Sequence, residues 1–285
     1  MRSMLFVPGD SERKLAKSLG TGADALILDL EDSVAADRRE AAREMSARFV
    51  AEHGGNADSP RLWVRINPVQ SGLAEADLAA FAVGPPHGIV LPKPRSGADA
   101  QAGAALIETA FGADASYEMI AIATEAPIAV LNLASFVAAT PRLIGLSWGS
   151  EDLSAELGAV TNRDEAGALT SPFQLARDLC LMTAVAGGMQ PLDTVYADFR
   201  DDDGLRRECA AAARDGFTGK LAIHPGQVTI INAAFTPSEA AIADARRVVD
   251  AFANTNTGVA SLDGTMLDKP HLIRAERLLA RAGKT

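Results

Sequence analysis

Charged side chains follow several short apolar segments of this sequence at the points where those segments end. Glu125 follows the apolar segment 118–123, and Asp152 follows the next such segment, which begins at Leu143. Two carboxylates with open positions between them suit a hard cation such as Mg2+, which prefers oxygen ligands and keeps sites for water and substrate. The same spacing also fits two solvated acids, or acids paired with a neighbouring arginine, so both interpretations stay open.

Two cations end the segments that precede these acids. Arg65 closes the segment that begins at Leu62, and an arginine held there can bind a carboxylate or a developing enolate oxygen through two hydrogen bonds. A structural ion pair with Glu31 or Asp32 is an equally compatible role. Lys93 stands between two prolines, where it could pair with the acids or serve as a Schiff-base amine.

One histidine and two cysteines carry weaker signals. His224 ends the last apolar segment but has no second histidine at HxH or HxxxH spacing, which favours a hydrogen-bonding role over metal ligation. Cys180 and Cys209 are too few for a disulfide framework, and both lie in helix-like segments. We therefore expect them to be buried thiols.

These residues need a scaffold that brings the ends of the apolar segments together. Eight such segments alternate with helical stretches, without hairpin signals, and they begin at Met4, Ala25, Leu62, Gly88, Glu118, Leu143, Leu192 and Lys220. Eight parallel strands close a (β/α)8 TIM barrel, an α/β fold in which all carboxyl ends meet at one face. An open doubly wound sheet is the alternative, but residues 8–13 lack its GxGxxG turn. Seven predicted strands end in polar residues: Asp32, Arg65, Lys93, Glu125, Asp152, Asp198 and His224.

The predicted barrel domain covers residues 1–253, and residues 254–285 form a separate C-terminal segment. This segment opens as a loop, and its later part, residues 269–282, has the apolar periodicity of an amphipathic helix. A closed barrel does not need such a helix. The segment is therefore predicted to be a lid that covers the barrel mouth or packs on a neighbouring subunit.

Composition excludes several functional classes. The formal net charge of −10 offers no basic face to a nucleic acid. No apolar run reaches the roughly 20 residues that span a bilayer, and the first run stops at Pro8, too early for a signal peptide. We therefore expect a soluble cytoplasmic protein without nucleic-acid or membrane partners.

Seven short motifs lie at the ends of successive predicted strands: RS-LFVPG at 2–9, DLEDSV at 29–34, RIN at 65–67, LPK at 91–93, TE at 124–125, ED at 151–152 and IHP at 223–225. Together they resemble the citrate lyase beta-subunit-like proteins, a group that includes malyl-CoA and citramalyl-CoA lyases within the HpcH/HpaI aldolase superfamily. The resemblance covers essentially the whole chain. It implies a TIM barrel assembled as a homotrimer or hexamer, and reversible Claisen or aldol cleavage that depends on Mg2+, which Mn2+ could replace.

The resemblance also implies roles for individual residues. Glu125 and Asp152 match the metal ligands, and Arg65 matches the residue that binds substrate oxygen and stabilises the enolate. Asp268, within the lid motif at 261–270, matches an acid–base aspartate that acts on the adjacent subunit. The other implied positions are Phe6 and Lys17 as coenzyme A contacts, Glu151, Asp152, Ile223 and His224 as substrate contacts, and Asp29, Glu31, Asp32 and Lys93 as supporting groups.

Several activities are compatible with this resemblance. We expect a lyase that cleaves, or forms, a 2-hydroxyacyl-CoA thioester such as malyl-CoA or citramalyl-CoA, with acetyl-CoA and glyoxylate or pyruvate as the other partners. A (3S)-malyl-CoA thioesterase on the same scaffold is the main alternative. A citrate lyase beta subunit and a non-enzymatic binder of oxoacids or acyl-CoA are further alternatives, although the lid motif favours a CoA-thioester enzyme.

Overall fold

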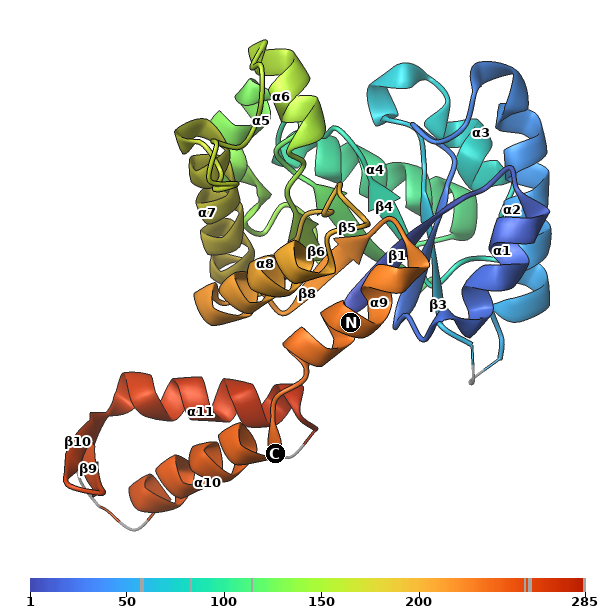
Figure 1. Cartoon of the computed structure of the whole chain (residues 1–285). Helices are drawn as coiled ribbons and strands as arrows, with labels where there is room; N and C mark the ends of the chain where they lie inside the picture. The colour runs from blue at the N-terminus through green and yellow to red at the C-terminus, as the bar shows by residue number, and fades with distance from the viewer. Residues whose placement is uncertain (57–58, 83, 114, 254, 256–257, 284–285) are drawn as a thin grey trace. The chain divides into compact units, whose positions relative to one another are not determined.

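Eight parallel strands close in sequential order into a barrel, so the predicted TIM-barrel fold is confirmed (Figure 1). The computed structural model describes residues 1–56, 59–82, 84–113, 115–253, 255 and 258–283. The barrel strands are β1 (Ser3–Pro8), β2 (Ala25–Asp29), β3 (Arg61–Arg65), β4 (Gly88–Leu91), β5 (Glu118–Ile122), β6 (Leu143–Ser147), β7 (Gln190–Asp193) and β8 (Gly219–Ala222). The β1–β8 pairing closes the ring.

Helices follow the strands on the outside of the barrel (Figure 1). They are α1 (Glu12–Ser18), α2 (Arg39–His53), α3 (Ala74–Ala79), α4 (Gly97–Phe111), α5 (Pro127–Leu131), α6 (Glu151–Leu157), α7 (Ser171–Ala186), α8 (Asp202–Asp215) and α9 (Pro225–Phe235). Short 3-10 turns cover residues 19–21, 36–38, 69–71 and 133–136. Within the described ranges, no helix combines the length and the apolar character that crossing a membrane requires.

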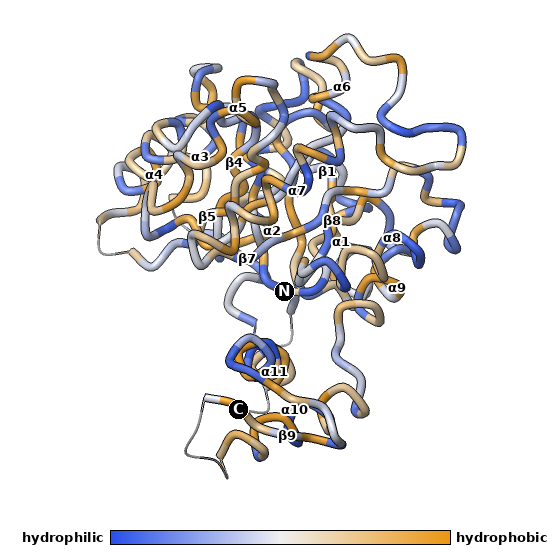
Figure 2. The backbone as a smooth tube through the Cα atoms, turned by 90° about the vertical axis from the view of Figure 1, so that its left-hand side faces the viewer, coloured by the Kyte–Doolittle hydropathy of each residue, from blue (hydrophilic) through white to orange (hydrophobic). Residues whose placement is uncertain are grey.

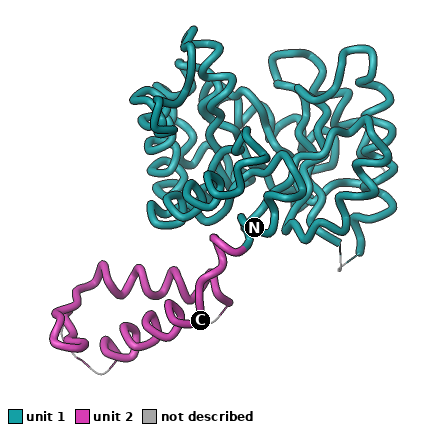
Figure 3. The backbone as a smooth tube through the Cα atoms, in the orientation of Figure 1, with its two compact units in different colours: residues 1–232 teal, residues 233–285 magenta. Residues whose placement is uncertain are grey.

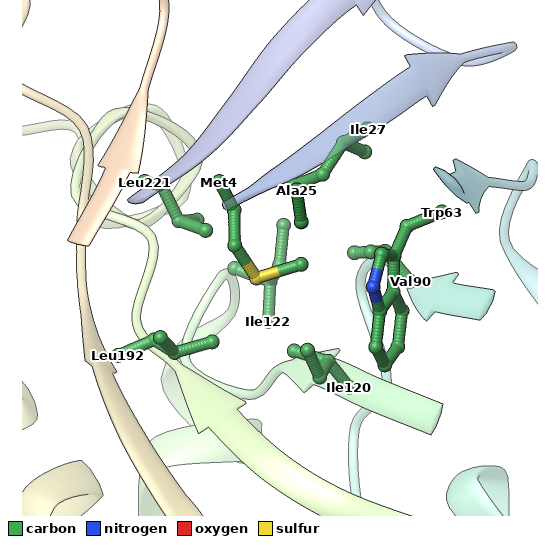
Figure 4. Packing of buried hydrophobic residues seen from close by; sticks show 9 residues of the cluster. All are labelled: Met4, Ala25, Ile27, Trp63, Val90, Ile120, Ile122, Leu192 and Leu221. Carbon is green, nitrogen blue, oxygen red and sulfur yellow. The ribbon is translucent and has the colours of Figure 1, made fainter. Parts of the chain in front are cut away.

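The barrel interior is filled by alternate residues of the strands, as Figure 4 shows. The buried cluster consists of Met4, Ala25, Ile27, Trp63, Val90, Ile120, Ile122, Leu192 and Leu221. Side chains two residues apart on a strand share a face. The next inward positions of β1, β2 and β3 are therefore Phe6, Asp29 and Arg65, and the apolar interior becomes charged at the carboxyl ends of the strands.

The seventh strand is shorter than the sequence predicts. We expected it to run from Leu192 to Ala197 and to end at Asp198, but β7 ends at Asp193 and Asp198 lies exposed beyond it. The apolar pattern continues past Asp193, whereas the described pairing of β7 with β8 extends only to Lys220. Strand partners, rather than β propensity, therefore set this boundary.

A buried ion-pair network lies on the outward side of β7 and β8. Lys220 Nζ donates to Asp193 Oδ2 at 2.8 Å and to Glu208 Oε1 at 2.7 Å. Trp148 Nε1 donates to Asp193 Oδ1 at 2.7 Å. Burial alone would raise the pKa of Asp193, but Lys220 and Arg177 outweigh it and hold that pKa below its ordinary value. The network links the turn after β6 to β7, β8 and the helices outside them.

Both cysteines are buried free thiols, as predicted. Cys180 lies in α7 and Cys209 in α8. Burial raises the pKa of the Cys209 thiol to about 12 and raises that of Cys180 as well. Neither thiol is therefore suited to react as a thiolate.

The contacts divide the chain into two compact units, residues 1–232 and 233–285 (Figure 3). In the second unit α10 (Glu239–Ala253) packs on α11 (Lys269–Arg281), and β9 (Val259–Leu262) pairs with β10 (Thr265–Asp268) as an antiparallel hairpin. The predicted division after residue 253 would leave α10 with the barrel, whereas its apolar side packs with α11. That 254–285 reach a neighbouring subunit stays a prediction.

The α10–α11 contact follows from the amphipathic pattern of both helices. Ile242 and Ala245 of α10 form a buried cluster with Ala275 and Leu279 of α11. Figure 2 looks nearly along the axis of α11, and both hydrophilic and hydrophobic residues colour its turns. The helical part of the predicted segment, 269–282, is therefore confirmed, whereas the β9–β10 hairpin before it was not predicted.

The Lys220→Met substitution tests the buried network. It leaves Asp193 and Glu208 without the ammonium that both contact, and removing one partner of a buried ion pair typically costs about 3–5 kcal/mol. We expect the free energy of unfolding, measured by urea denaturation, to fall by that order. The same substitution at Lys14, which is exposed on α1, should change it little. Equal effects at the two positions would contradict this account.

Candidate active site

The carboxyl ends of β1, β2 and β3 bring an arginine, an aspartate and an aromatic ring together. Asp29 and Arg65 are register partners in the β2–β3 ladder. Nε and Nη2 of Arg65 each donate to one carboxylate oxygen of Asp29, both at 2.7 Å. The guanidinium carbon of Arg65 lies 4.7 Å from the centre of the Phe6 ring. The bidentate pair and the ring together hold the guanidinium in one plane.

Asp29 and Arg65 both stay in their charged forms. Burial alone would raise the pKa of Asp29, but the hydrogen bonds and charge of Arg65 lower it below its ordinary value. Burial alone would lower the pKa of Arg65, and Asp29 raises it instead. Nη1 of Arg65 lies 3.0 Å from Glu31 Oε2 and 3.8 Å from Asp32 Oδ2. The ion pair considered from the sequence is therefore present, together with the stronger pair to Asp29.

Lys93 contacts acids that follow β2 and acids that follow β5 and β6. Its Nζ donates to Glu31 Oε1 at 2.5 Å and to both oxygens of Asp32 at 2.9 Å. The same atom lies 3.3 Å from Asp152 Oδ1, and the backbone N–H donates to Glu125 Oε2 at 2.5 Å. Lys93 adopts a positive φ of 54°, a backbone conformation that costs a non-glycine residue energy. These contacts compensate for that cost.

The ammonium of Lys93 is held in its charged form. Burial alone would lower the pKa of Lys93, but its hydrogen bonds to Glu31 and Asp32 raise it well above its usual range. A Schiff base requires a neutral amine. The structure therefore favours the ion-pairing role of Lys93 over the Schiff-base role.

Glu31 completes the supporting groups. Burial raises the pKa of this carboxyl to about 7, against the opposing effects of Arg65 and Lys93. The predicted supporting residues Asp29, Glu31 and Asp32 all contact Arg65, Lys93 or both. The structure thus brings these acids together around the two cations.

Glu125 and Asp152 lie close enough to influence each other. Glu125 is only 4% exposed, and burial raises its pKa well above the ordinary value, with the charge of Asp152 raising it further. Asp152 stands half-exposed in the first turn of α6. A divalent cation between the carboxylates of Glu125 and Asp152 would relieve their repulsion, so this donor set fits Mg2+.

The candidate metal site offers two carboxylates rather than a closed protein cage. Over the described ranges, no group of three or more His, Cys, Asp or Glu side chains could hold a metal ion. Mg2+ is commonly held by one or two carboxylates, with water or substrate oxygens completing its octahedron. The arrangement therefore suits a metal ion that also binds substrate.

Gly149 makes the space that Glu125 occupies. A Cβ atom at position 149 would lie 2.6 Å from Cγ of Glu125 and 3.3 Å from Cγ2 of Ile122. The N–H of Gly149 donates to Thr124 Oγ1 at 3.0 Å. The sequence shows only that Gly149 ends an apolar run. The need for a small side chain at this position comes from residues of the neighbouring strand, and a sequence pattern does not show them. Gly149 thus positions a candidate metal ligand.

The predicted substrate contacts that follow β6 and β8 are fixed by local hydrogen bonds. Glu151 Oε1 accepts from Asn162 Nδ2 at 3.0 Å. The backbone N–H groups of Ile223 and His224 donate to Gln227 Oε1 at 2.9 and 3.2 Å. Phe199, a residue that the sequence analysis did not select, stacks on the His224 ring with 4.8 Å between the ring centres. His224 is therefore held by packing and hydrogen bonds, and its role as a substrate contact stays a prediction.

Two predicted site residues do not lie at the carboxyl end of a barrel strand. Lys17 is exposed in the last turn of α1, at the end of the helix opposite to the one that follows β1. Asp268 belongs to the C-terminal unit, where it is the N-cap of α11. A coenzyme A contact for Lys17 and an acid–base role for Asp268 stay predictions.

The Gly149→Ala substitution tests the candidate metal site. The added methyl group must displace Glu125 near the base of its side chain, so we expect the Mg2+ affinity, measured by calorimetry, to fall at least tenfold. The control is Gly20→Ala, where no heavy atom lies within 4 Å of the added carbon. Unchanged affinity in Gly149→Ala would show that Glu125 does not bind the metal.

The raised pKa of Glu125 predicts the direction in which Mg2+ binding depends on pH. A metal ion binds the ionised carboxylate, and a raised pKa keeps Glu125 protonated to higher pH than an ordinary glutamate. The apparent Mg2+ affinity should therefore weaken as the pH falls through the raised pKa of Glu125. Calorimetry in buffers of different ionisation heat should also detect proton release on binding. An affinity that does not change with pH would refute the prediction.

Comparisons with known proteins agree with this architecture. The HpcH/HpaI aldolase/citrate lyase family matches residues 2–225. The (3S)-malyl-CoA thioesterase of Cereibacter sphaeroides strain KD131 is 38% identical over 293 aligned residues, which cover 99% of this chain and 94% of that protein. The mitochondrial citramalyl-CoA lyase of Rattus norvegicus is 33% identical and covers 99% of this chain and 86% of its own length.

A solved structure extends the comparison to ligands. Protein CitE of Mycobacterium tuberculosis, in complex with magnesium, acetoacetate and coenzyme A, superposes with a TM-score of 0.80 at 33% identity and covers 99% of this chain and 98% of its own. The magnesium and the coenzyme A belong to that protein. The likeness extends over the barrel and the C-terminal helices alike. This chain belongs to the HpcH/HpaI aldolase/citrate lyase family.

Proposed function

We propose that this protein is a Mg2+-dependent lyase that cleaves a 2-hydroxyacyl-CoA thioester into acetyl-CoA and a 2-oxoacid. Malyl-CoA and citramalyl-CoA are the candidate substrates, with glyoxylate and pyruvate as the corresponding oxoacids. The observation that carries the proposal is the pairing of a buried glutamate, Glu125, with Asp152 beside a fixed arginine. The relatives that act on malyl-CoA and citramalyl-CoA support the substrate class.

Glu125 and Asp152 would hold the metal ion, which when bound supplies Lewis-acid stabilisation to the oxygens of the substrate. Arg65 is oriented by Asp29 and can donate hydrogen bonds to the oxygen that becomes negative as the C–C bond breaks. Lys93 keeps a positive charge beside Asp152 and Glu31. Asp268 would give its proton to the enolate carbon and so complete acetyl-CoA.

A thioesterase is the second candidate, because the 38% identical relative from Cereibacter sphaeroides is a (3S)-malyl-CoA thioesterase. In that reaction water attacks the thioester carbonyl, and the C–C bond stays intact. Both reactions need a bound CoA thioester and stabilisation of negative charge on the thioester oxygen. The residues Arg65, Glu125 and Asp152 serve either activity, so the products must separate the two.

The products can be distinguished in one assay. The protein is incubated with Mg2+ and either malyl-CoA or citramalyl-CoA, and the free thiol and the oxoacid are measured in parallel. We expect glyoxylate or pyruvate to form without free coenzyme A. Free coenzyme A together with intact malate or citramalate would identify a thioesterase. An Arg65→Lys variant serves as the control, because a lysine cannot reproduce the bidentate contact with Asp29 and should lower either activity.

A further inference from the structure

The side chains of Asp268 and His271 make a close contact in the C-terminal unit. Oδ1 of Asp268 lies 2.6 Å from Nδ1 of His271. An ionised carboxylate oxygen and an unprotonated ring nitrogen are both acceptors, so a contact this short requires one proton between them. The side chains are 55% and 37% exposed, respectively, so both can exchange protons with solvent.

The start of α11 holds this contact in place. Asp268 is the N-cap of the helix, and its side chain accepts from the backbone N–H of His271. In return the backbone N–H of Asp268 lies 3.2 Å from Nδ1 of His271 and donates to it when the shared proton is on Oδ1 of Asp268. Glutamate or glutamine usually occupies the histidine's position in such a capping box. A histidine there makes the same reciprocal contact, and its ring has two nitrogens that can each carry a proton.

The described neighbours of Asp268 include one uncharged residue, one lysine and a more distant ion pair. Asp268 is paired across the β9–β10 hairpin with Val259, which is uncharged. Lys269 follows Asp268 directly in the chain. The ion pair between Arg247 of α10 and Asp263 lies at the turn of the hairpin, at the opposite end from Asp268. Among the described residues, His271 is thus the titratable side chain that contacts the Asp268 carboxylate.

We propose that His271 is a positioning residue that orients Asp268 and restores to it the proton that it donates. This rests on the proposed function. In the cleavage direction, the N–H bond at Nδ1 of the His271 imidazolium breaks as an O–H bond forms at Oδ1 of Asp268. That O–H bond then breaks as a C–H bond forms at the enolate carbon, which leaves a carboxylate beside a neutral ring. The solvent returns a proton to the ring, and the proton that leaves the substrate hydroxyl balances it.

Nuclear magnetic resonance of the full-length protein with 15N-labelled histidine tests the shared proton. The chain has four histidines, and His271→Gln identifies the resonances of His271. We expect the Nδ1 resonance of His271 to shift in Asp268→Asn, while the other three histidines keep their positions. An unchanged Nδ1 resonance in Asp268→Asn would overturn the proposal, and it would do so whether or not the protein cleaves a CoA thioester.

Kinetics test the role of the pair in turnover. Glutamine retains the capping box but cannot carry the extra proton, so His271→Gln should lower kcat at least tenfold and leave KM within about twofold. Glu276→Gln, which changes one exposed charge further along α11, is the matched control. In His271→Ala, added imidazole should restore part of kcat. Wild-type kcat in His271→Gln would overturn the proposal, whereas absence of conversion by the wild type would refute the proposed function alone.

Discussion

The bidentate ion pair between Arg65 and Asp29 is the contact on which the rest of the site depends. It joins neighbouring strands in register, and both side chains are buried at the carboxyl end of the barrel. A buried charge is costly unless a partner and hydrogen bonds compensate for it. Arg65 therefore needs Asp29, and the fixed guanidinium in turn faces Phe6 and the other acids of the rim.

Excess negative charge distinguishes this rim from an ordinary structural network. Five carboxylates surround two cations; the acids are Asp29, Glu31, Asp32, Glu125 and Asp152, and the cations are Arg65 and Lys93. Burial raises the pKa values of Glu31 and Glu125, which is the response of acids that lack enough positive charge nearby. A divalent cation supplies the missing charge. The network outside β7 and β8, by contrast, keeps Asp193 ionised with its own lysine and arginine.

Much of the fold could be predicted because strands and helices leave local signals. Short apolar runs with polar ends identified all eight strands, and β4 has the predicted bounds. The predicted end of β7 was wrong. Asp193 faces away from the barrel interior and pairs with Lys220, a partner 27 residues later. No local pattern shows which acid has such a partner. The sequence analysis also did not predict the short helix α6, which follows β6 almost directly.

The sequence by itself determined the barrel, the charged residues at the strand ends and the resemblance to the family, because periodicity and motif order are properties of the chain. Only the tertiary structure decided how those charges are used. Asp29 rather than Glu31 is the bidentate partner of Arg65, Lys93 is an ion-paired cation, and Gly149 is small because Glu125 lies against it. These outcomes depend on distances between residues of different strands, which exist only after the barrel has closed.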